Sequence, residues 1–357
     1  MNRRTREARL AIMAIMAIMA ILLLVLGSIS FAQTASPCMA EKAQQDERTY
    51  QSCLRMYTSQ KIFQSPYVMA VYATKGPHTA LGTGVVANIN GAEYVITNNH
   101  VIEGADDIFL QFSHADKQIY TARVIGRDPA ADLALLIAPV LSRGIGTVLF
   151  GRSPRLGEEV YALGYPHDMR SVTFGFINAL ETRSWLYFLM QAPINPGNSG
   201  GPLFNANHEL IGFNTVIIPG ATMGFAISIK YARQILSRLT REQLVEHGDV
   251  GFDFADTWRM LPPFFAKHSL SFPPAEQGIM VVRIDPASHA AKNGIKIGDL
   301  IVALNGAAIM NAEDLDRNVF LHYRPGDEIV LTTKRGAQMF ERRIKLMAYA
   351  SPFAGAQ

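Results

Sequence analysis

The sequence predicts a mainly β protein in which a β domain of barrel or sandwich type precedes a smaller α+β domain. Between about residues 65 and 229, short β-like runs alternate with turn residues, and helical spacing appears only after them. Residues 249–347 then carry a second set of apolar runs divided by glycine turns. Because 49% of the residues are hydrophobic and 18% are charged, the chain can bury two cores, which excludes a disordered protein.

The first 32 residues are predicted to be an export segment. A basic stretch is followed by an uncharged apolar run over 10–26, and Ser30 and Ala32 supply the small residues that a signal peptidase requires. The alternative is an uncleaved helix that anchors the chain in the inner membrane. At about 1.5 Å per residue this run falls a little short of the roughly 30 Å hydrocarbon core. Both alternatives place the remainder of the chain outside the cytoplasm.

The charge balance argues against nucleic acid as a partner. The formal charge is +3, and the four arginines among the first nine residues, set against Glu7, account for all of it. The rest of the chain is therefore neutral, whereas phosphate binding requires clustered lysine and arginine.

The chain has two cysteines, Cys38 and Cys53, in a polar N-terminal segment over residues 33–64. An exported chain enters an oxidising compartment, so we expect a disulfide between them. Closing a loop of this size contributes about 3 kcal/mol in the chain-entropy model. Two free thiols are the alternative. No histidine lies nearby in the sequence, and no metal site is predicted.

The predicted strands begin with residues 81–89 and 92–97, which flank Asn90-Gly91, a pair typical of a tight hairpin turn. Further predicted strands cover residues 108–112, 119–125, 160–164, 174–180, 187–191, 209–216 and 224–227. Helical spacing follows over residues 229–239, and residues 240–243 form a capping box for a further helix that stops at Gly248. These features assign residues 65–240 to the first domain and residues 241–248 to a linker.

Three motifs in the β region carry candidate chemistry. TNNHV (97–101) places His100 at a strand end, DPAADLALL (128–136) places Asp132 before a buried apolar run, and INPGNSGGPL (194–203) places Ser199 in a glycine-rich turn. A serine hydroxyl becomes a nucleophile when an imidazole takes its proton, and a carboxylate then orients the imidazole. The glycines allow backbone N–H groups to converge on an oxyanion, at roughly 3–4 kcal/mol per donor. An α/β-hydrolase elbow is excluded, because there the histidine comes last and a helix follows the serine.

These three motifs, together with GFNT (212–215) and GFAI (224–227), resemble the HtrA/Deg family of trypsin-fold serine proteases. The resemblance covers roughly residues 65–347 and implies two six-stranded β-barrels with the active site between them. It implies that His100 is the general base, Asp132 its orienting carboxylate and Ser199 the nucleophile. The N–H groups of Gly197 and Ser199 are the implied oxyanion hole.

The resemblance also indicates the specificity pocket. Ile194 and Ile217 are expected to line it, and Pro193 stands where a trypsin-like pocket would hold an acidic residue. An aliphatic pocket favours a small or medium apolar residue before the scissile bond, because a charged side chain would be desolvated without a partner. The chain departs from the family at QAP (191–193), where the family usually has Asp-Ala-Ala, and this departure puts the resting activity in doubt.

Residues 249–347 resemble the PDZ domain that follows the protease domain in this family, and residues 348–357 form a tail. DVGF (249–252) resembles a carboxylate-binding loop, so Val250, Gly251 and Phe252 are expected to bind a peptide C-terminus through backbone N–H groups. An unrelated α+β domain in which Gly251 is only a turn glycine is the alternative.

The sequence therefore predicts an exported serine endopeptidase that cleaves unfolded or damaged envelope proteins through an acyl-enzyme, in a bacterial periplasm or cell envelope. No metal or organic cofactor is implied. The family resemblance implies a homotrimer or higher oligomer built through the segment before the first barrel, with Phe63 and Tyr67 as contacts. Two alternatives remain: a chaperone-like peptide-binding protein whose triad is rarely assembled, and a regulatory protease dedicated to one membrane protein.

Overall fold

The computed structural model describes Cys38 and residues 47–112, 118–180, 185–217, 223–270 and 278–349. The predicted export segment and residues 350–357 of the tail lie outside this part. The chain divides into two compact units, one ending at Lys61 and the other running from Ile62, and each is described by itself.

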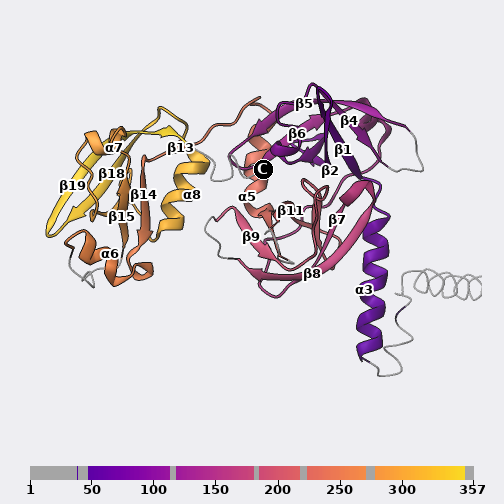
Figure 1. Cartoon of the computed structure of the whole chain (residues 1–357), viewed down its shortest axis with the longest axis horizontal. Coiled ribbons are helices and arrows are strands. Elements are labelled where there is room, and N and C mark those ends of the chain that lie inside the picture. The colour runs from indigo at the N-terminus through magenta and orange to yellow at the C-terminus, as the bar shows by residue number, and fades with distance from the viewer. Residues whose placement is uncertain are drawn as a thin grey trace, which may run out of the picture. The chain divides into compact units, whose positions relative to one another are not determined.

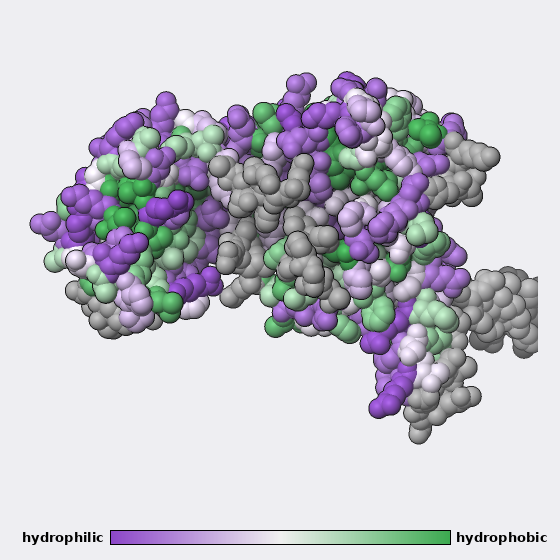
Figure 2. Space-filling view, viewed as in Figure 1, coloured by the Kyte–Doolittle hydropathy of each residue, from purple (hydrophilic) through white to green (hydrophobic). Residues whose placement is uncertain are grey.

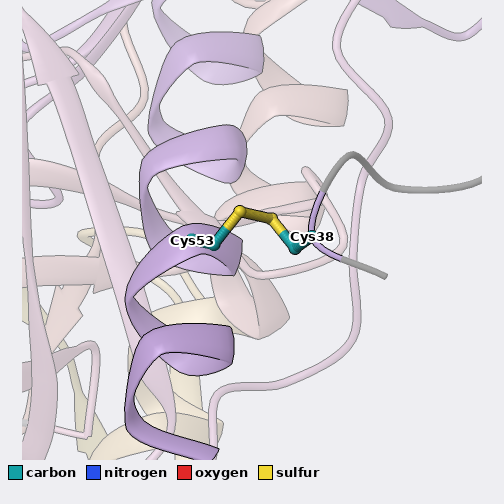
Figure 3. The surroundings of a disulfide bond; sticks show 2 residues. All are labelled: Cys38 and Cys53. Carbon is teal, nitrogen blue, oxygen red and sulfur yellow. A yellow bond between two sulfur atoms is a disulfide. The ribbon is translucent and has the colours of Figure 1, made fainter. Parts of the chain in front are cut away.

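Helix α3 (Glu47–Phe63) makes up most of the described part of the N-terminal unit and ends two residues beyond it. It was not predicted, because the segment is largely polar. Cys53 lies on α3 and forms a disulfide with Cys38, with the two Cα atoms 5.6 Å apart (Figure 3). Across the described ranges, no helix is long and apolar enough to span a membrane.

The first barrel is closed, with the strand order β1-β2-β3-β6-β5-β4 and β4 paired back to β1 (Figure 1). Its strands are β1 (Val68–Lys75), β2 (His78–Ile89), β3 (Ala92–Thr97), β4 (Asp107–Gln111), β5 (Tyr120–Asp128) and β6 (Leu133–Ile137). Short helices α4 (Asn99–Ile102) and η1 (Pro139–Arg143) follow β3 and β6. The predicted hairpin turn is confirmed: Asn90 and Gly91 have φ of 54° and 88°, and Ile89 pairs with Ala92.

The second barrel is also closed, with the strand order β10-β11-β12-β9-β8-β7. Its elements are β7 (Glu159–Gly164), η2 (Pro166–Asp168), β8 (Ser171–Ala179), β9 (Tyr187–Met190), β10 (Pro202–Asn205), β11 (Leu210–Ile217) and β12 (Gly224–Ser228). The large side chains of Tyr161, Phe204 and Phe213 are fully buried in a core cluster that also includes residues of β1, β2 and β3. The two barrels therefore pack against each other through an apolar interior, and this positions the loops between them.

Helix α5 (Ile229–Leu239) follows β12 and buries the predicted apolar face. The expected second helix is wrong, because Thr240 is instead the C-terminal cap of α5 and no helix covers residues 241–247. These residues pair with β5: Arg127 N–H donates to the Gln243 carbonyl at 3.0 Å, and Val245 N–H donates to the Arg127 carbonyl at 2.9 Å. The predicted linker is thus a packed segment.

The last domain has a sheet with the order β14-β15-β16-β18-β19, and β14 lies at its edge. Its strands are β13 (Gly248–Asp249), β14 (Phe252–Asp256), β15 (Ile279–Ile284), β16 (Leu300–Leu304), β17 (Ala307–Ala308), β18 (Glu328–Arg335), β19 (Gln338–Lys345) and β20 (Met347–Ala348). Its helices are η3 (Thr257–Arg259), α6 (Pro262–Lys267), α7 (His289–Lys292) and α8 (Ala312–His322). Strands β13 and β20 pair with each other, so the start and the end of this domain meet.

The face in view in Figure 2 interleaves hydrophilic and hydrophobic residues. Strongly exposed large hydrophobic side chains, such as Leu261 at 71% and Met310 at 80%, lie on different segments of the last domain. Of the two predicted subunit contacts, Phe63 is exposed and Tyr67 is half-buried.

Candidate active site

His100 lies on α4, the single helical turn that begins just after β3. Its ring nitrogen Nδ1 is 2.8 Å from Asp132 Oδ2, and its backbone N–H donates to Asp132 Oδ1 at 2.9 Å. The two hydrogen bonds join both carboxylate oxygens to one residue. The ring orientation and its Nδ1–H tautomer are thereby fixed, and Nε2 is left to accept a proton.

Asp132 ends the four-residue hairpin loop between β5 and β6, in which Asp128 pairs with Leu133. Its φ is 56°, a left-handed conformation that aspartate adopts more readily than most residues. Thr215 Oγ1 donates to Asp132 Oδ2 at 2.6 Å, and Asn98 Nδ2 donates to the Asp132 carbonyl at 2.7 Å. Residues of both barrels therefore hold this carboxylate in place.

The environment of His100 changes its proton affinity. Burial alone lowers the pKa of the imidazole, but the hydrogen bond to Asp132, the charge of Asp132 and that of Glu103 outweigh it and raise the pKa above its ordinary value of 6.5. An imidazole with a raised pKa is a stronger base, which suits proton abstraction from a hydroxyl.

Ser199 lies in a glycine-rich turn between β9 and β10. Asn198 N–H donates to the Asn195 carbonyl at 2.9 Å, and Gly197 has φ of 103°. A Cβ atom on Gly197 would lie 2.3 Å from the Tyr165 carbonyl oxygen, so only glycine fits there. Thr83 of the first barrel anchors the turn, since its N–H donates to the Ser199 carbonyl at 2.8 Å and its hydroxyl donates to the Gly197 carbonyl at 2.6 Å.

The Ser199 hydroxyl donates to the Thr215 carbonyl at 3.2 Å. Among the described residues it makes no hydrogen bond to His100, so the histidine and the carboxylate are joined while the serine is turned aside. The N–H groups of Gly197 and Ser199 donate to no protein acceptor within the described ranges, which leaves both able to bind a carbonyl oxygen.

The predicted pocket residues are only partly described. Ile194 is half-buried and packs against the core of the second barrel. Ile217 ends β11, and its side chain lies outside the described part. Pro193 is exposed, and its carbonyl accepts a hydrogen bond from Thr173 Oγ1 at 2.7 Å.

The predicted carboxylate-binding loop precedes the edge strand β14. A small hollow of about 30 Å³ beside it lies between β14 and α8, and Val250 and Phe252 line it. Asp249 Oδ1, however, accepts the N–H of Gly251 at 2.6 Å, so the chain's own carboxylate occupies one of the amides expected to bind a peptide terminus. Burial raises the pKa of Asp249, and the charges of Asp253 and Asp285 act in the same direction.

The supporting residues Thr83, Asn98 and Thr215 were not predicted. Asn98 and Thr215 do lie in the motifs that were singled out, but their roles depend on the other barrel or on a neighbouring loop. Within the described ranges no group of three or more histidine, cysteine or acidic side chains could hold a metal ion.

Two domain families match the chain in the order that the fold shows. A model of the trypsin-like peptidase domain matches residues 82–213, and a model of the PDZ domain matches residues 248–346. The crystal structure of the serine endoprotease from Yersinia pestis is 29% identical, with a TM-score of 0.61 over 80% of this chain and 95% of that chain. The chain belongs to the HtrA/Deg family.

Other HtrA/Deg proteins match over similar portions. The HtrA-type protease AlgW with decapeptide has a TM-score of 0.65 and 26% identity over 81% of this chain and 97% of that chain. A probable periplasmic serine endoprotease, DegP-like, from Ectopseudomonas mendocina (strain ymp) is 36% identical over 72% of this chain and 54% of the relative. The chain spans about half the length of the curated relatives it matches. The HtrA/Deg membership and the two closed barrels confirm the predicted fold class.

Proposed function

We propose that this HtrA/Deg chain is a serine endopeptidase that cleaves unfolded or damaged proteins of the bacterial envelope. The observation that carries the proposal is the pair of hydrogen bonds between His100 and Asp132. Beside them, Ser199 lies in a turn in which only glycine fits at position 197. This arrangement supplies a base of raised proton affinity, a nucleophile and two free backbone donors.

In the proposed mechanism, the Ser199 hydroxyl leaves the Thr215 carbonyl and turns to His100. Nε2 takes the hydroxyl proton while Oγ attacks the scissile carbonyl, and the N–H groups of Gly197 and Ser199 bind the oxyanion. The imidazolium then gives its proton to the leaving amine, which leaves an acyl-enzyme. A water molecule activated by His100 hydrolyses the ester and restores Ser199. The hydrogen bonds of a triad often form fully only with substrate present, so the resting contact to Thr215 agrees with this sequence.

The proposed location is the periplasm. Three observations support it: the basic and apolar segment over 1–32, the disulfide between Cys38 and Cys53, and the similarity to probable periplasmic serine endoproteases. We further propose that the last domain binds peptides with free C-termini between β14 and α8, and that the chain forms a homotrimer through the segment before the first barrel.

The test is covalent labelling of residues 33–357 by a fluorophosphonate probe, with and without unfolded casein. We expect labelling that Ser199→Ala and His100→Ala abolish, and faster labelling when casein is present. No labelling of folded protein in either condition would contradict the proposal and favour the chaperone-like alternative, for which the resting contact to Thr215 gives a basis. Labelling without casein cleavage would favour a protease dedicated to one substrate.

A further inference from the structure

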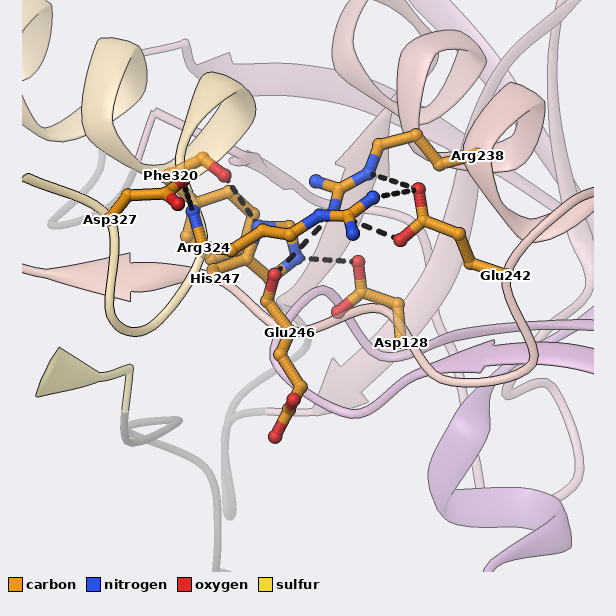
Figure 4. Close-up of polar contacts among 8 residues, drawn as sticks. All are labelled: Asp128, Arg238, Glu242, Glu246, His247, Phe320, Arg324 and Asp327. Carbon is orange, nitrogen blue, oxygen red and sulfur yellow. Dashed lines mark hydrogen bonds and ion pairs between the residues drawn. The ribbon is translucent and has the colours of Figure 1, made fainter. Parts of the chain in front are cut away.

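One histidine outside the candidate active site is completely buried. His247 belongs to the packed segment 241–248, and both its side chain and that of Asp128 have 0% exposed surface. Nε2 of His247 lies 2.7 Å from Asp128 Oδ2, at the end of β5. Nδ1 lies 2.5 Å from the Phe320 carbonyl oxygen on α8, and the two rings stack with centroids 3.6 Å apart (Figure 4).

The partners of His247 determine which way its hydrogen bonds can run. The carbonyl oxygen of Phe320 can only accept, so Nδ1 carries the hydrogen that it donates, and Nε2 and the Asp128 carboxyl share the second hydrogen bond. Phe320 lies in the last turn of α8, where a helix favours a positive charge. If α8 were longer, the backbone N–H of Arg324 would donate to the Phe320 carbonyl. It donates to Asp327 Oδ2 instead, so His247 supplies the hydrogen-bond donor that this carbonyl would otherwise lack.

The other oxygen of Asp128 leads to the candidate active site. Oδ1 accepts the N–H of Ala131 at 2.9 Å inside the hairpin loop that ends at Asp132. Asp132 follows directly, in its left-handed conformation. The carboxylate of Asp128 thus fixes the backbone of the loop that presents Asp132 to His100. Without His247, Oδ2 of the fully buried Asp128 would lose its hydrogen-bond partner.

A group of ion pairs around Glu242 lies beside the pair of His247 and Asp128. Substitution of Glu242 can therefore serve as a control for substitution of His247. Glu242 accepts from Arg324 at 2.8 Å and forms an ion pair with Arg238 at 3.3 Å, and Arg238 also reaches the Glu246 carbonyl at 3.4 Å (Figure 4). These side chains are partly exposed, and none of these contacts involves Asp128. Tyr187 is a titratable group that also senses Asp128: burial raises the pKa of its phenol, and the charges of Asp132 and Asp128 act in the same direction.

We propose that His247 is a positioning residue for Asp132: through Asp128 it holds the hairpin loop that carries this carboxylate, and through Phe320 it fastens that loop to α8 of the last domain. The proposal rests on the proposed peptidase function. A positioning role of this kind changes catalysis through geometry, because the fully buried His247 side chain cannot reach a bound substrate from the surface.

The main test compares His247→Phe with Glu242→Gln in cleavage of a short chromogenic peptide. Phenylalanine can still stack on Phe320 but donates no hydrogen bond, so we expect kcat to fall by about 2- to 30-fold with KM nearly unchanged. Glu242→Gln breaks the neighbouring ion pairs and should leave kcat unchanged. Asp128→Asn can keep the N–H of Ala131 on its amide oxygen and donate its amide N–H to Nε2 of His247, so we expect this variant to retain most of the activity.

The pH profile separates positioning from general loss of stability. When Asp132 loses its position, the hydrogen bond and charge that raise the pKa of His100 weaken. The acid limb of kcat/KM should therefore move to lower pH in His247→Phe and stay in place in Glu242→Gln. Unchanged kcat and pH profile in folded His247→Phe would overturn the proposal, and so would an equal loss in Glu242→Gln.

Nuclear magnetic resonance of wild-type protein labelled with 15N-histidine tests the hydrogen bonding of His247 directly and needs no variant. We expect an exchange-protected Nδ1–H signal from His247, and the absence of a protected Nδ1–H would overturn the proposal. If His247→Phe fails to fold, His247→Gln replaces it in the kinetic test. If the fluorophosphonate probe does not label the wild-type protein, the peptidase function itself is contradicted. This outcome is distinguishable from failure of the positioning role, in which the wild-type protein is labelled but His247→Phe keeps its kcat and pH profile.

Discussion

Asp132 shows how much of the candidate active site is determined at the scale of single residues. Its carboxylate accepts hydrogen bonds from the backbone and the ring of His100 and from Thr215, and its carbonyl accepts one from Asn98. Hydrogen bonds to a charged group are each worth about 1.5–3 kcal/mol. The position of the base therefore depends on several polar contacts that a motif search does not reveal.

The raised pKa of His100 predicts the pH dependence of the reaction. The neutral imidazole is the base, so activity should be lost as the pH falls through the pKa of the folded protein. Because this pKa lies above 6.5, the acid limb of kcat/KM should have its midpoint above pH 6.5. Peptide cleavage measured from pH 5 to 9 tests this, and a midpoint below 6.5 would show that burial outweighs Asp132.

At the scale of elements, some segments follow local rules and others follow their neighbours. The turn at Asn90-Gly91 and helix α5 were predictable, because a positive φ and a 3.6-residue apolar spacing are local properties. The capping box at residues 240–243 failed as a predictor, because pairing with Arg127 of β5 determines that segment. Helix α3 was missed since its sequence is mostly polar.

In the candidate site, too, some features could be predicted from local sequence and others depend on neighbouring segments. The motifs identified His100, Asp132 and Ser199, because their residue types and order are specific. The direction of the Ser199 hydroxyl and the occupation of the Gly251 amide by Asp249 could not be predicted, since both depend on where other backbone atoms lie.

The nucleophile turn gives a prediction at the element scale. Gly197→Ala brings Cβ to 2.3 Å from the Tyr165 carbonyl, so the turn must shift and one oxyanion donor is displaced. Loss of such a donor costs about 100- to 1000-fold in kcat, and we expect a fall of this order in peptide cleavage. Gly144→Ala is the control, because its φ is also positive, at 66°, but no atom lies within 4 Å of the added Cβ. Equal activity of the two variants would contradict the assigned role of the turn.

The disulfide gives a second prediction for an element, α3. The double variant Cys38→Ser/Cys53→Ser removes a cross-link over a sequence separation of 15, and we expect the free energy of opening α3 to fall by about 3 kcal/mol. Hydrogen exchange of the α3 amides measures this, and fluorophosphonate labelling should stay unchanged. Reduced wild-type protein should exchange like the variant. Exchange that is the same in oxidised wild type and the variant would show that the disulfide does not stabilise α3.

At the scale of the whole molecule, the segment from Ile62 onward holds both barrels and the PDZ domain in one compact unit. Trp185 Nε1 donates to Asp316 of α8 at 2.8 Å, and the Trp185 ring packs edge-on against Tyr231 and Phe320. Together with His247, these residues form a mixed aromatic and polar contact between the peptidase domain and the PDZ domain.

Asp316 makes the stability of this contact depend on pH. Burial is the main cause that raises its pKa from 3.8 to about 6, with Asp249 and Glu313 acting in the same direction and the Trp185 hydrogen bond acting against them. The folded protein thus binds this proton more tightly than the unfolded chain, and the associated stability is present below pH 3.8 and lost as the pH rises through about 6.

Asp316→Asn removes this titration while its amide oxygen can still accept from Trp185. We expect the variant to be more stable than wild type at pH 8, by at most about 3 kcal/mol, and equal to it near pH 4. Denaturant unfolding followed by tryptophan fluorescence at both pH values measures the difference. Glu341→Gln on the exposed part of β19 is the control, because Glu341 is not among the charges that raise the pKa of Asp316. A gain at pH 8 that persists at pH 4 would show that the charge of Asp316 is not the cause.

The packed segment 241–248 also bears on how the chain can be cut. A fragment that ends at residue 240 loses the two backbone hydrogen bonds to Arg127 and leaves the buried carboxylate of Asp128 without His247. Self-cleavage within residues 241–246 is therefore expected to inactivate the enzyme rather than release a free peptidase. A minimal peptidase fragment has to extend through residue 247, even though most of that segment lies outside both barrels.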